Sequence, residues 1–390
     1  MRAGPSGPRA IVVSMRLLHT ADWHLGRAFH GEDLLPAQAA LVDFLVAAAR
    51  EHEPDAILVA GDLYDRALPP VDAVRLADEA LSRLSELAPT LVISGNHDSA
   101  ARLGFGARML ARARLHLCTD PAAVGTPIPI ADGHVYPIPY LEPDLVRATL
   151  GVGERSHAAA LGAAMARVRT DAASRDAGPV VVMAHAFVAG AQPSESEREL
   201  AIGGAASVPA SAFAGADYLA LGHLHGPQRV GENGRYAGSP LALSFSEAAQ
   251  RTSIVVVEVA ADAAPSAELL PCPVPRPLAT LRGTLDALLA DPRLAEHEPA
   301  WVQATLTDPV RPSDAMERLR RRFPHAVALA FEPQGGSPAP GDSYQRLRGL
   351  DDDELVQRFV ADTRGAPADE DELALLRDAL TARRVAEALA

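Results

Sequence analysis

The stretch Thr90-Leu-Val-Ile-Ser-Gly-Asn-His-Asp98 joins a short apolar run directly to a cluster of polar side chains. The apolar run, Thr90–Ser94, predicts a buried strand. Gly95-Asn96-His97-Asp98 follows it, and such a four-residue match arises by chance in on the order of 1% or fewer of chains this long. The stretch therefore predicts a strand whose carboxyl end carries side chains with a chemical role.

The same arrangement recurs in both directions along the chain. Further strands are predicted at Met15–Ala21, Ala56–Ala60, Val180–Ala184 and Tyr218–Leu221. The polar groups that follow them are Asp22-Trp23-His24, Gly61-Asp62, His185 and Gly222-His223-Leu224-His225. Amphipathic helices are predicted to start at Pro36 and to run from Pro70 to Leu87, between the first three strands. In a layered α/β fold the carboxyl ends of strands gather at one edge, so these groups are expected to form one site.

The 390 residues are too many for one compact core, and the sequence predicts several parts. Strands at Arg235–Gly238 and Ile254–Val259 complete the main domain, and the proline-rich Pro271–Pro277 marks its end. A small α+β domain follows, with strands at Trp301–Leu306 and Ala326–Phe331 on either side of a short basic helix, Met316–Phe323. The expected boundaries are a disordered or non-native extension at 1–14, the main domain at 15–275, the small domain at 276–333, a linker at 334–347 and a helical segment at 348–390.

Seven side chains at the strand ends are candidate metal ligands, and they comprise two carboxylates, one amide and four imidazoles. They are Asp22, His24, Asp62, Asn96, His185, His223 and His225. Each motif alone has an ordinary explanation as a turn or a buried histidine. Their joint occurrence in a fixed order, each after an apolar strand, favours a shared site instead. These donors suit a pair of divalent ions such as Mn²⁺, with Fe²⁺, Zn²⁺ or Mg²⁺ as alternatives.

The motifs resemble the calcineurin-like metallophosphoesterase superfamily, whose pattern is D-x-H, G-D-x-x-D, G-N-H-[DE], H and G-H-x-H. Longer segments are similar to the bacterial SbcD nuclease family, namely His19–Gly26, Gly95–Ser99, Ser196–Leu200, Ala220–His225 and Tyr236–Leu241. The similarity covers about residues 15–275, and the rest matches in layout only. It implies an α/β fold: a layered metallophosphoesterase β-sandwich flanked by helices, a small α+β capping domain, and a C-terminal helical tail that docks on the ATPase SbcC.

The resemblance also implies how the ligands divide. One metal would be held by Asp22, His24, Asp62 and His225, and the second by Asp62, Asn96, His185 and His223. Two ions about 3.5–4 Å apart need a shared carboxylate to offset their repulsion, and together they activate water for attack on phosphorus. Asp62 would therefore bridge the pair.

Further roles follow from the same resemblance. His97 is assigned to the leaving-group oxygen as a general acid, and Asp65 to holding the His97 ring. A turn-capping aspartate is the alternative for Asp65, and Asp98 is expected to be structural. Arg27 and Arg102 are candidates for contacts to DNA phosphates, although a solvated arginine is the commoner outcome.

The favoured function is a Mn²⁺-dependent nuclease that degrades double-stranded DNA ends from 3′ to 5′ and opens hairpins in DNA repair and recombination. Its expected partners are an SbcC-type ATPase and a second copy of the chain, within a heterotetramer. The net charge of −14 argues against a broad cationic DNA-binding surface, unless SbcC supplies much of that surface. It favours the alternative of a stand-alone phosphoesterase acting on nucleotides or phosphoproteins. A non-catalytic scaffold is disfavoured because no expected ligand is missing.

Two isolated cysteines, Cys118 and Cys272, suggest neither a disulfide framework nor a thiolate metal site. No run of about 18 apolar residues predicts a membrane span, and no apolar segment near the start predicts a secretory signal. The expected location is cytoplasmic.

Overall fold

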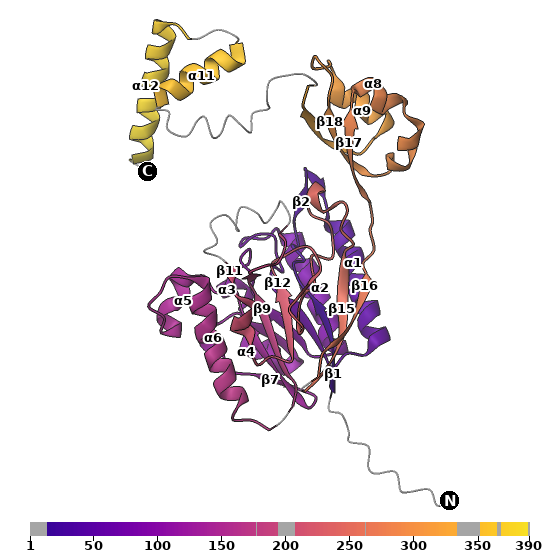
Figure 1. Ribbon diagram of the computed structural model, residues 1–390, viewed down its shortest axis with the longest axis vertical. Helices are drawn as coiled ribbons and strands as arrows, with labels where there is room; N and C mark the ends of the chain where they lie inside the picture. The colour runs from indigo at the N-terminus through magenta and orange to yellow at the C-terminus, as the bar shows by residue number, and fades with distance from the viewer. Residues whose placement is uncertain are drawn as a thin grey trace, which may run out of the picture. The chain divides into compact units, whose positions relative to one another are not determined.

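The computed structural model describes residues 14–176, 178–193, 207–261, 263–333, 352–364 and 368–388 (Figure 1). The chain divides into two compact units. The first runs to Thr280 and includes Arg293–Gln303 and Arg322–Ala328; the second holds Leu281–Pro292, Ala304–Arg321 and the described residues from Leu329 onward. Three sequence-based expectations lie outside the described residues: the extension before Ser14, the linker at 334–347, and the Ser196–Leu200 motif.

Two six-stranded sheets form the first unit. The first, in the order β16-β15-β1-β4-β5-β6, consists of β1 (Ser14–Thr20), β4 (Ala56–Ala60), β5 (Thr90–Ile93), β6 (Leu115–Cys118), β15 (Ser253–Ala260) and β16 (Ser266–Pro271). The second, in the order β13-β14-β12-β9-β8-β7, consists of β7 (Ile128–Ile130), β8 (Gly133–Ile138), β9 (Val180–His185), β12 (Tyr218–Gly222), β13 (Gln228–Val230) and β14 (Gly234–Tyr236). Strands β1, β4, β5 and β6 are parallel, and so are β8, β9, β12 and β14. Within each sheet, the carboxyl ends of these parallel strands therefore share one edge.

The two sheets pack face to face, with helices on their outer faces (Figure 1). The flanking helices are α1 (Leu35–His52) and α2 (Val71–Leu87) on the first sheet, and α5 (Pro143–Leu150) and α6 (His157–Ala172) on the second. Successive strand residues point to opposite faces, so Leu58 packs between the sheets while Ile57 packs toward α1 and α2. In the second sheet Val181 faces inward and Val182 packs toward α5 and α6. The predicted layered sandwich flanked by helices is confirmed.

Local sequence explains where these helices start and stop. Proline needs no N–H partner, and Pro36 accordingly lies in the first turn of α1. Pro70 precedes α2, and the chain turns extended at Ala88 immediately before Pro89. The Ser156 side chain accepts a hydrogen bond from the N–H of Ala159 and so caps α6.

The strands predicted in the main domain are confirmed to within one or two residues at each end, and β15 is antiparallel to β1 as expected. The segment between Asp98 and Val180 carries elements for which no prediction was made. These include β6, β7, β8, α5 and α6, together with the short helices α3 (Ala100–Leu103) and α4 (Ala107–Leu110). Two short strand pairs complete this unit, β2 (Ala28–Phe29) with β3 (Glu32–Asp33) and β10 (Phe187–Val188) with β11 (Ser207–Val208).

A small three-stranded sheet follows, in the order β17-β18-β19. Its elements are β17 (Leu278–Gly283), α8 (Leu285–Ala290), β18 (Trp301–Leu306), α9 (Ala315–Arg322) and β19 (Ala326–Phe331). Both strands predicted here are confirmed, and the basic helix begins one residue earlier than expected. Two helices, α11 (Asp352–Arg364) and α12 (Glu370–Ala388), contact each other near the end of the chain. None of the helices within the described ranges is long and apolar enough to cross a membrane.

Leu58→Ala tests the core between the sheets. Leu58 is fully buried, so the truncation should lower the free energy of unfolding by about 2–5 kcal/mol through lost packing and the cavity left behind. The matched control Leu145→Ala, at a position 79% exposed, should change it by less than about 0.5 kcal/mol. Chemical denaturation measures both, and equal losses would contradict the packing of the two sheets.

Candidate metal centre

The seven predicted ligands come from five strand ends of the two sheets. Asp22 and His24 follow β1, Asp62 follows β4, and Asn96 follows β5. The other three lie at the ends of β9 and β12, as His185, His223 and His225. All are buried except Asn96, which is half-buried. The fold thus brings polar groups that are far apart in the sequence to one edge.

Asp62 lies between histidines from both sheets. Its Oδ2 is 3.3 Å from Nε2 of His185 and 3.7 Å from Nε2 of His24. Two groups of donor atoms lie within 4.8 Å of one another, His24 with Asp62 and His97, and Asp22 with Asp62 and His185. Asp62 belongs to both groups, as expected of a carboxylate that two ions would share.

The remaining ligands adjoin this pair of groups. Asn96 Oδ1 lies 2.9 Å from His185 Nε2 and 3.0 Å from His223 Nδ1. The rings of His185 and His223 are 5.1 Å apart, and those of His24 and His225 are also 5.1 Å apart. In the division that the resemblance implies, each of these histidine pairs serves one ion. Asp22, which that division places with His24, instead groups with Asp62 and His185.

The backbone of the ligand loops is strained. Four predicted ligands have a positive φ, which side chains with a Cβ rarely adopt: Asp22 (54°), His24 (46°), Asp62 (48°) and His223 (108°). Such conformations persist only where surrounding contacts impose them, and they cluster at active sites. Here the N–H of Asp22 donates to Gly61 O at 3.0 Å, and the N–H of His24 donates to Asp62 O at 3.0 Å. The loop after β1 is therefore hydrogen-bonded to the loop after β4.

Two glycines of the motifs lie so close to candidate ligands that no Cβ would fit. A Cβ on Gly95 would lie 2.1 Å from Oδ1 of Asp62, which is closer than any real contact. A Cβ on Gly61, whose φ is +94°, would lie 2.2 Å from Nδ1 of His185. Neither ligand could keep its position beside a larger residue.

His24 provides the clearest test of whether these residues fit a metal. Its ring is 1% exposed, and neither ring nitrogen has a well-formed hydrogen bond among the residues that the structure describes: the carboxylate of Asp65 lies 3.5 Å from Nδ1 and that of Asp62 lies 3.7 Å from Nε2. A buried polar atom without a partner costs about 1–3 kcal/mol, so it needs another explanation. Coordination of a cation by an imidazole nitrogen supplies one, and the donor set therefore fits a metal.

Burial and charge set the protonation of these groups. Burial lowers the pKa of His24 to about 4 and that of His223 to about 3, so both rings are neutral near pH 7 and keep a lone pair for a metal. Burial also raises the pKa of Asp22 to about 7. Burial opposes the charged form of His185 as well, but Asp62 and Asp22 raise its pKa to about 9. A metal bound there would replace the His185 proton.

His97 and Asp65 are in contact, but through the main chain. His97 Nδ1 lies 2.8 Å from the backbone carbonyl oxygen of Asp65. The Asp65 carboxylate instead accepts from Arg27 Nη1 at 3.0 Å and lies 3.5 Å from His24 Nδ1. Arg102 donates to the carbonyl of Ala67 at 3.5 Å. Asp65 thus anchors Arg27 with its side chain and the His97 ring with its carbonyl.

The structural role expected of Asp98 is confirmed. Its carboxylate accepts hydrogen bonds from the N–H groups of Leu63, Tyr64 and Gly95, at 3.2, 3.0 and 2.9 Å. Asp98 therefore ties the loop after β4 to the loop after β5.

Comparison with known proteins decides the family. Residues 15–227 match the calcineurin-like phosphoesterase family. The chain belongs to this family. Residues 274–364 of the phosphoesterase match the type 5 capsule protein repressor C-terminal domain. The resemblance predicted from the motifs is confirmed, and the phosphoesterase is a metal-dependent hydrolase.

Two similar proteins align with most of the phosphoesterase. The SbcD subunit of nuclease SbcCD from Staphylococcus saprophyticus subsp. saprophyticus is 29% identical over 349 residues, which cover 88% of this chain and 92% of the relative. The crystal structure of TT1561 of Thermus thermophilus aligns with 62% of this chain and 93% of its own, at 16% identity and a TM-score of 0.39.

Two buried polar residues that sequence reasoning missed also contact the ligands. Gln38 on α1 donates to the His24 carbonyl at 2.8 Å and accepts from the N–H of Gly26 at 3.1 Å. Glu247 Oε1 lies 3.0 Å from Nδ1 of His225. Gln38 is a polar side chain on the apolar face of a predicted helix, and that pattern could have marked it as a buried residue with a polar partner. No comparable pattern marks Glu247.

Gly95→Ala should weaken Mn²⁺ binding by the phosphoesterase by roughly 10-fold or more, because the added methyl group displaces the Asp62 carboxylate. Isothermal titration with Mn²⁺ measures the change, and thermal unfolding of the metal-free variant checks that it still folds. Gly162→Ala is the control, since a Cβ there meets no atom within 4 Å. Unchanged Mn²⁺ binding by Gly95→Ala would rule Asp62 out as the shared ligand.

Proposed function

We propose that this phosphoesterase is the nuclease subunit of an SbcC–SbcD-type complex that acts on double-stranded DNA ends and hairpins in repair and recombination. The reaction would be hydrolysis of phosphodiester bonds, by 3′–5′ exonuclease and endonuclease action. The observation that carries the proposal is the convergence of donor side chains from both sheets around Asp62. The similarity to an SbcCD nuclease over 88% of the chain supports DNA as the substrate.

The proposed ligands would hold two divalent cations, with Mn²⁺ the preferred ion for a mixed carboxylate, amide and imidazole set. Fe²⁺, Zn²⁺ and Mg²⁺ are the alternatives. Bound ions would supply an activated water and positive charge at the phosphoryl oxygens. Asp22, His24, Asp62 and His225 would hold one ion, and Asp62, Asn96, His185 and His223 the other.

His97 is proposed as the general acid. A carbonyl oxygen can only accept a hydrogen bond, so the contact to Asp65 O fixes the proton of the neutral ring on Nδ1. To act as a general acid the ring must be the imidazolium, which carries a second proton on Nε2. It would pass that proton to the leaving-group oxygen and return to the neutral form with its proton on Nδ1. Arg27 pairs with the carboxylate of Asp65, whose carbonyl contacts the His97 ring, and Arg102 follows His97 by five residues; both arginines are proposed to contact DNA phosphates.

His97→Gln should keep the metals and lose cleavage, with a fall in kcat of about 10²–10⁴-fold from loss of general acid catalysis. Mn²⁺ titration and a single-turnover cleavage assay separate the two effects. A variant that cuts at the wild-type rate would refute the assignment. A variant that loses a metal would instead make His97 a ligand, since its ring lies in one of the two donor groups around Asp62.

The substrate is tested by comparing Mn²⁺-dependent hydrolysis of linear duplex DNA with that of bis(p-nitrophenyl) phosphate. We expect duplex ends to be degraded, and co-purified SbcC-type ATPase with ATP to change the rate. The net charge of −14 favours a second candidate, a stand-alone phosphoesterase of nucleotides or phosphoproteins. Hydrolysis of the small diester with duplex DNA left intact, even with the ATPase present, would favour that candidate.

The proposed complex contains two copies of the phosphoesterase, and an apolar groove beside α2 supports this. The groove has a volume of about 550 Å³ and includes Leu68 and Phe105, which are 66% and 82% exposed. Val71 and Met109 nearby are 64% and 67% exposed. Soluble monomers rarely expose so many large apolar side chains together. A two-fold interface, in which each copy covers the same patch of the other, would bury them.

Phe105→Asp should shift the phosphoesterase from dimer to monomer, because a charge at the interface centre costs desolvation energy. Sedimentation equilibrium over a range of protein concentrations measures the change. Leu145→Asp is the matched control, an equally exposed leucine on α5 away from the groove, and should leave the dimer intact. A monomeric wild type, or a dimer that tolerates Phe105→Asp, would exclude this face.

The remaining parts are assigned by the same proposal. Residues 276–333 would form the capping domain and residues 348–390 the segment that docks on SbcC, in a cytoplasmic complex. Helix α12 supports docking, since Leu375 on it is 71% exposed. A protein partner would remove such a side chain from water.

A further inference from the structure

Glu247 is a buried carboxylate beside a proposed metal ligand. It is 1% exposed, with Oε1 at 3.0 Å from Nδ1 of His225. Its second oxygen, Oε2, accepts a hydrogen bond from the N–H of Leu243 at 2.8 Å. Both carboxylate oxygens therefore have a defined partner, and one of those partners is a ligand.

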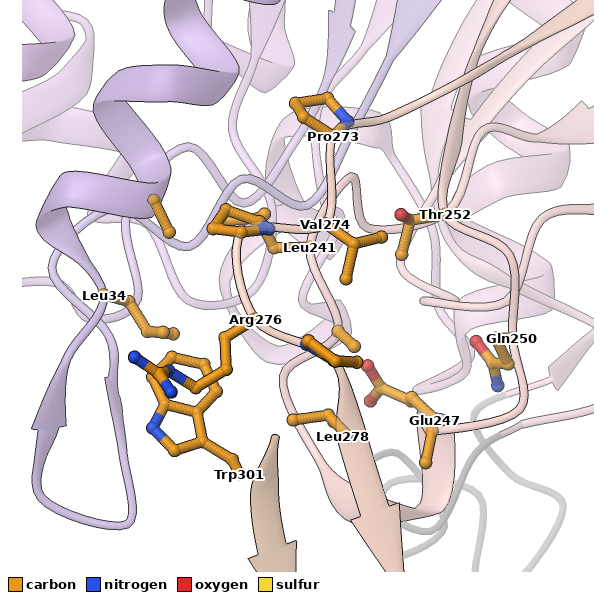
Figure 2. Close-up of a pocket in the computed structure, with 15 residues that line it drawn as sticks. Leu34, Leu241, Glu247, Gln250, Thr252, Pro273, Val274, Arg276, Leu278 and Trp301 are labelled. Carbon is orange, nitrogen blue, oxygen red and sulfur yellow. The ribbon is translucent and has the colours of Figure 1, made fainter. Parts of the chain in front are cut away.

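Glu247 also lines a pocket whose wall is mostly apolar, with Gln250, Thr252 and Arg276 as its other polar side chains. Figure 2 shows it on the wall of a pocket of about 140 Å³ that Leu34, Val274, Leu278 and Trp301 also line. The one arginine in this wall, Arg276, is engaged elsewhere, with its guanidinium 5.7 Å above the Trp301 ring and Nη1 donating to Pro299 O. A carboxylate in such a place needs compensation for the water it has lost. The imidazole N–H of His225 is a suitable group.

The backbone fixes the direction of the Glu247 side chain. Glu247 ends a short 3-10 helix, Phe245–Glu247, which the Ser244 side chain caps by accepting from the N–H of Ser246. The carbonyl of Glu247 accepts from the N–H of Gln250 at 2.8 Å. The carboxylate is thus held toward His225 before any metal binds.

We propose that Glu247 is a positioning residue for the metal that His225 would hold. By accepting the Nδ1 proton it fixes the tautomer in which Nε2 carries the lone pair, and its negative charge makes that nitrogen a stronger donor. His185 differs, because its Nδ1 faces the neutral carbonyl of Ala60 at 2.9 Å. Glu247 would therefore act on one of the two proposed ions. The inference rests on the proposed metal site but does not depend on DNA as the substrate.

Glu247→Gln is the decisive variant. It keeps the side chain's size, but its single carbonyl oxygen cannot accept from both His225 Nδ1 and the N–H of Leu243. We expect one of the two Mn²⁺-binding events to weaken by about 10–100-fold while the other is unchanged. The measurement is titration followed by the electron paramagnetic resonance signal of free Mn²⁺. Glu258→Gln is the control, since Glu258 pairs with Arg16 at the surface and contacts none of the proposed ligands.

The His225→Ala background separates positioning from a merely structural role. If Glu247 acts through His225, Glu247→Gln causes no further loss of Mn²⁺ affinity in that background. An equal loss with or without His225, or wild-type Mn²⁺ affinity in Glu247→Gln, overturns the proposal while leaving the proposed function intact. A wild type that binds no Mn²⁺ overturns both.

Discussion

The site depends on keeping one carboxylate, Asp62, charged and buried. Burying a lone carboxylate costs several kcal/mol, so its neighbours must compensate. Asp62 Oδ1 accepts from the N–H of His97 at 2.8 Å, and Oδ2 faces the rings of His185 and His24. Burial opposes ionisation of Asp62, yet the cationic His185 ring holds its pKa well below the usual range. The two sheets must therefore pack closely enough to bring His185 to a carboxylate of the other sheet.

That requirement explains features that are costly in themselves. Left-handed backbone at the ligand loops and glycine at position 95 both lower intrinsic stability, and both bring Asp62 within reach of its neighbours. Burial of apolar side chains in the core between the sheets offsets these costs. Asp98 adds a rigid link, since it binds N–H groups of two loops at once. Much of this strain lies at the sheet edge where the candidate ligands gather, since they account for four of the nine non-glycine residues with positive φ among those that the structure describes.

Sequence patterns could predict that the candidate ligands lie close together because each follows a strand with a clear apolar run, and parallel strands place such residues at one edge. The same reasoning could not find Glu247, which lies 22 residues after His225 on a short 3-10 helix. Its contact exists only through tertiary packing. For Asp65 the resemblance suggested a contact with His97, and the structure places the Asp65 carbonyl there while the carboxylate pairs with Arg27. Which of the two groups meets His97 depends on the turn that the backbone takes. No strand or helix was predicted between residues 100 and 175, because this segment has no polar motif after an apolar run to mark where an element ends.

The proposed ligands span residues 22 to 225, and each sheet supplies part of the set. The chain must therefore be synthesised past β12 before the full set of candidate ligands exists. The earlier strands have to associate without a metal held by the whole set. If these residues hold the ions, loading would be a late event that follows assembly of both sheets.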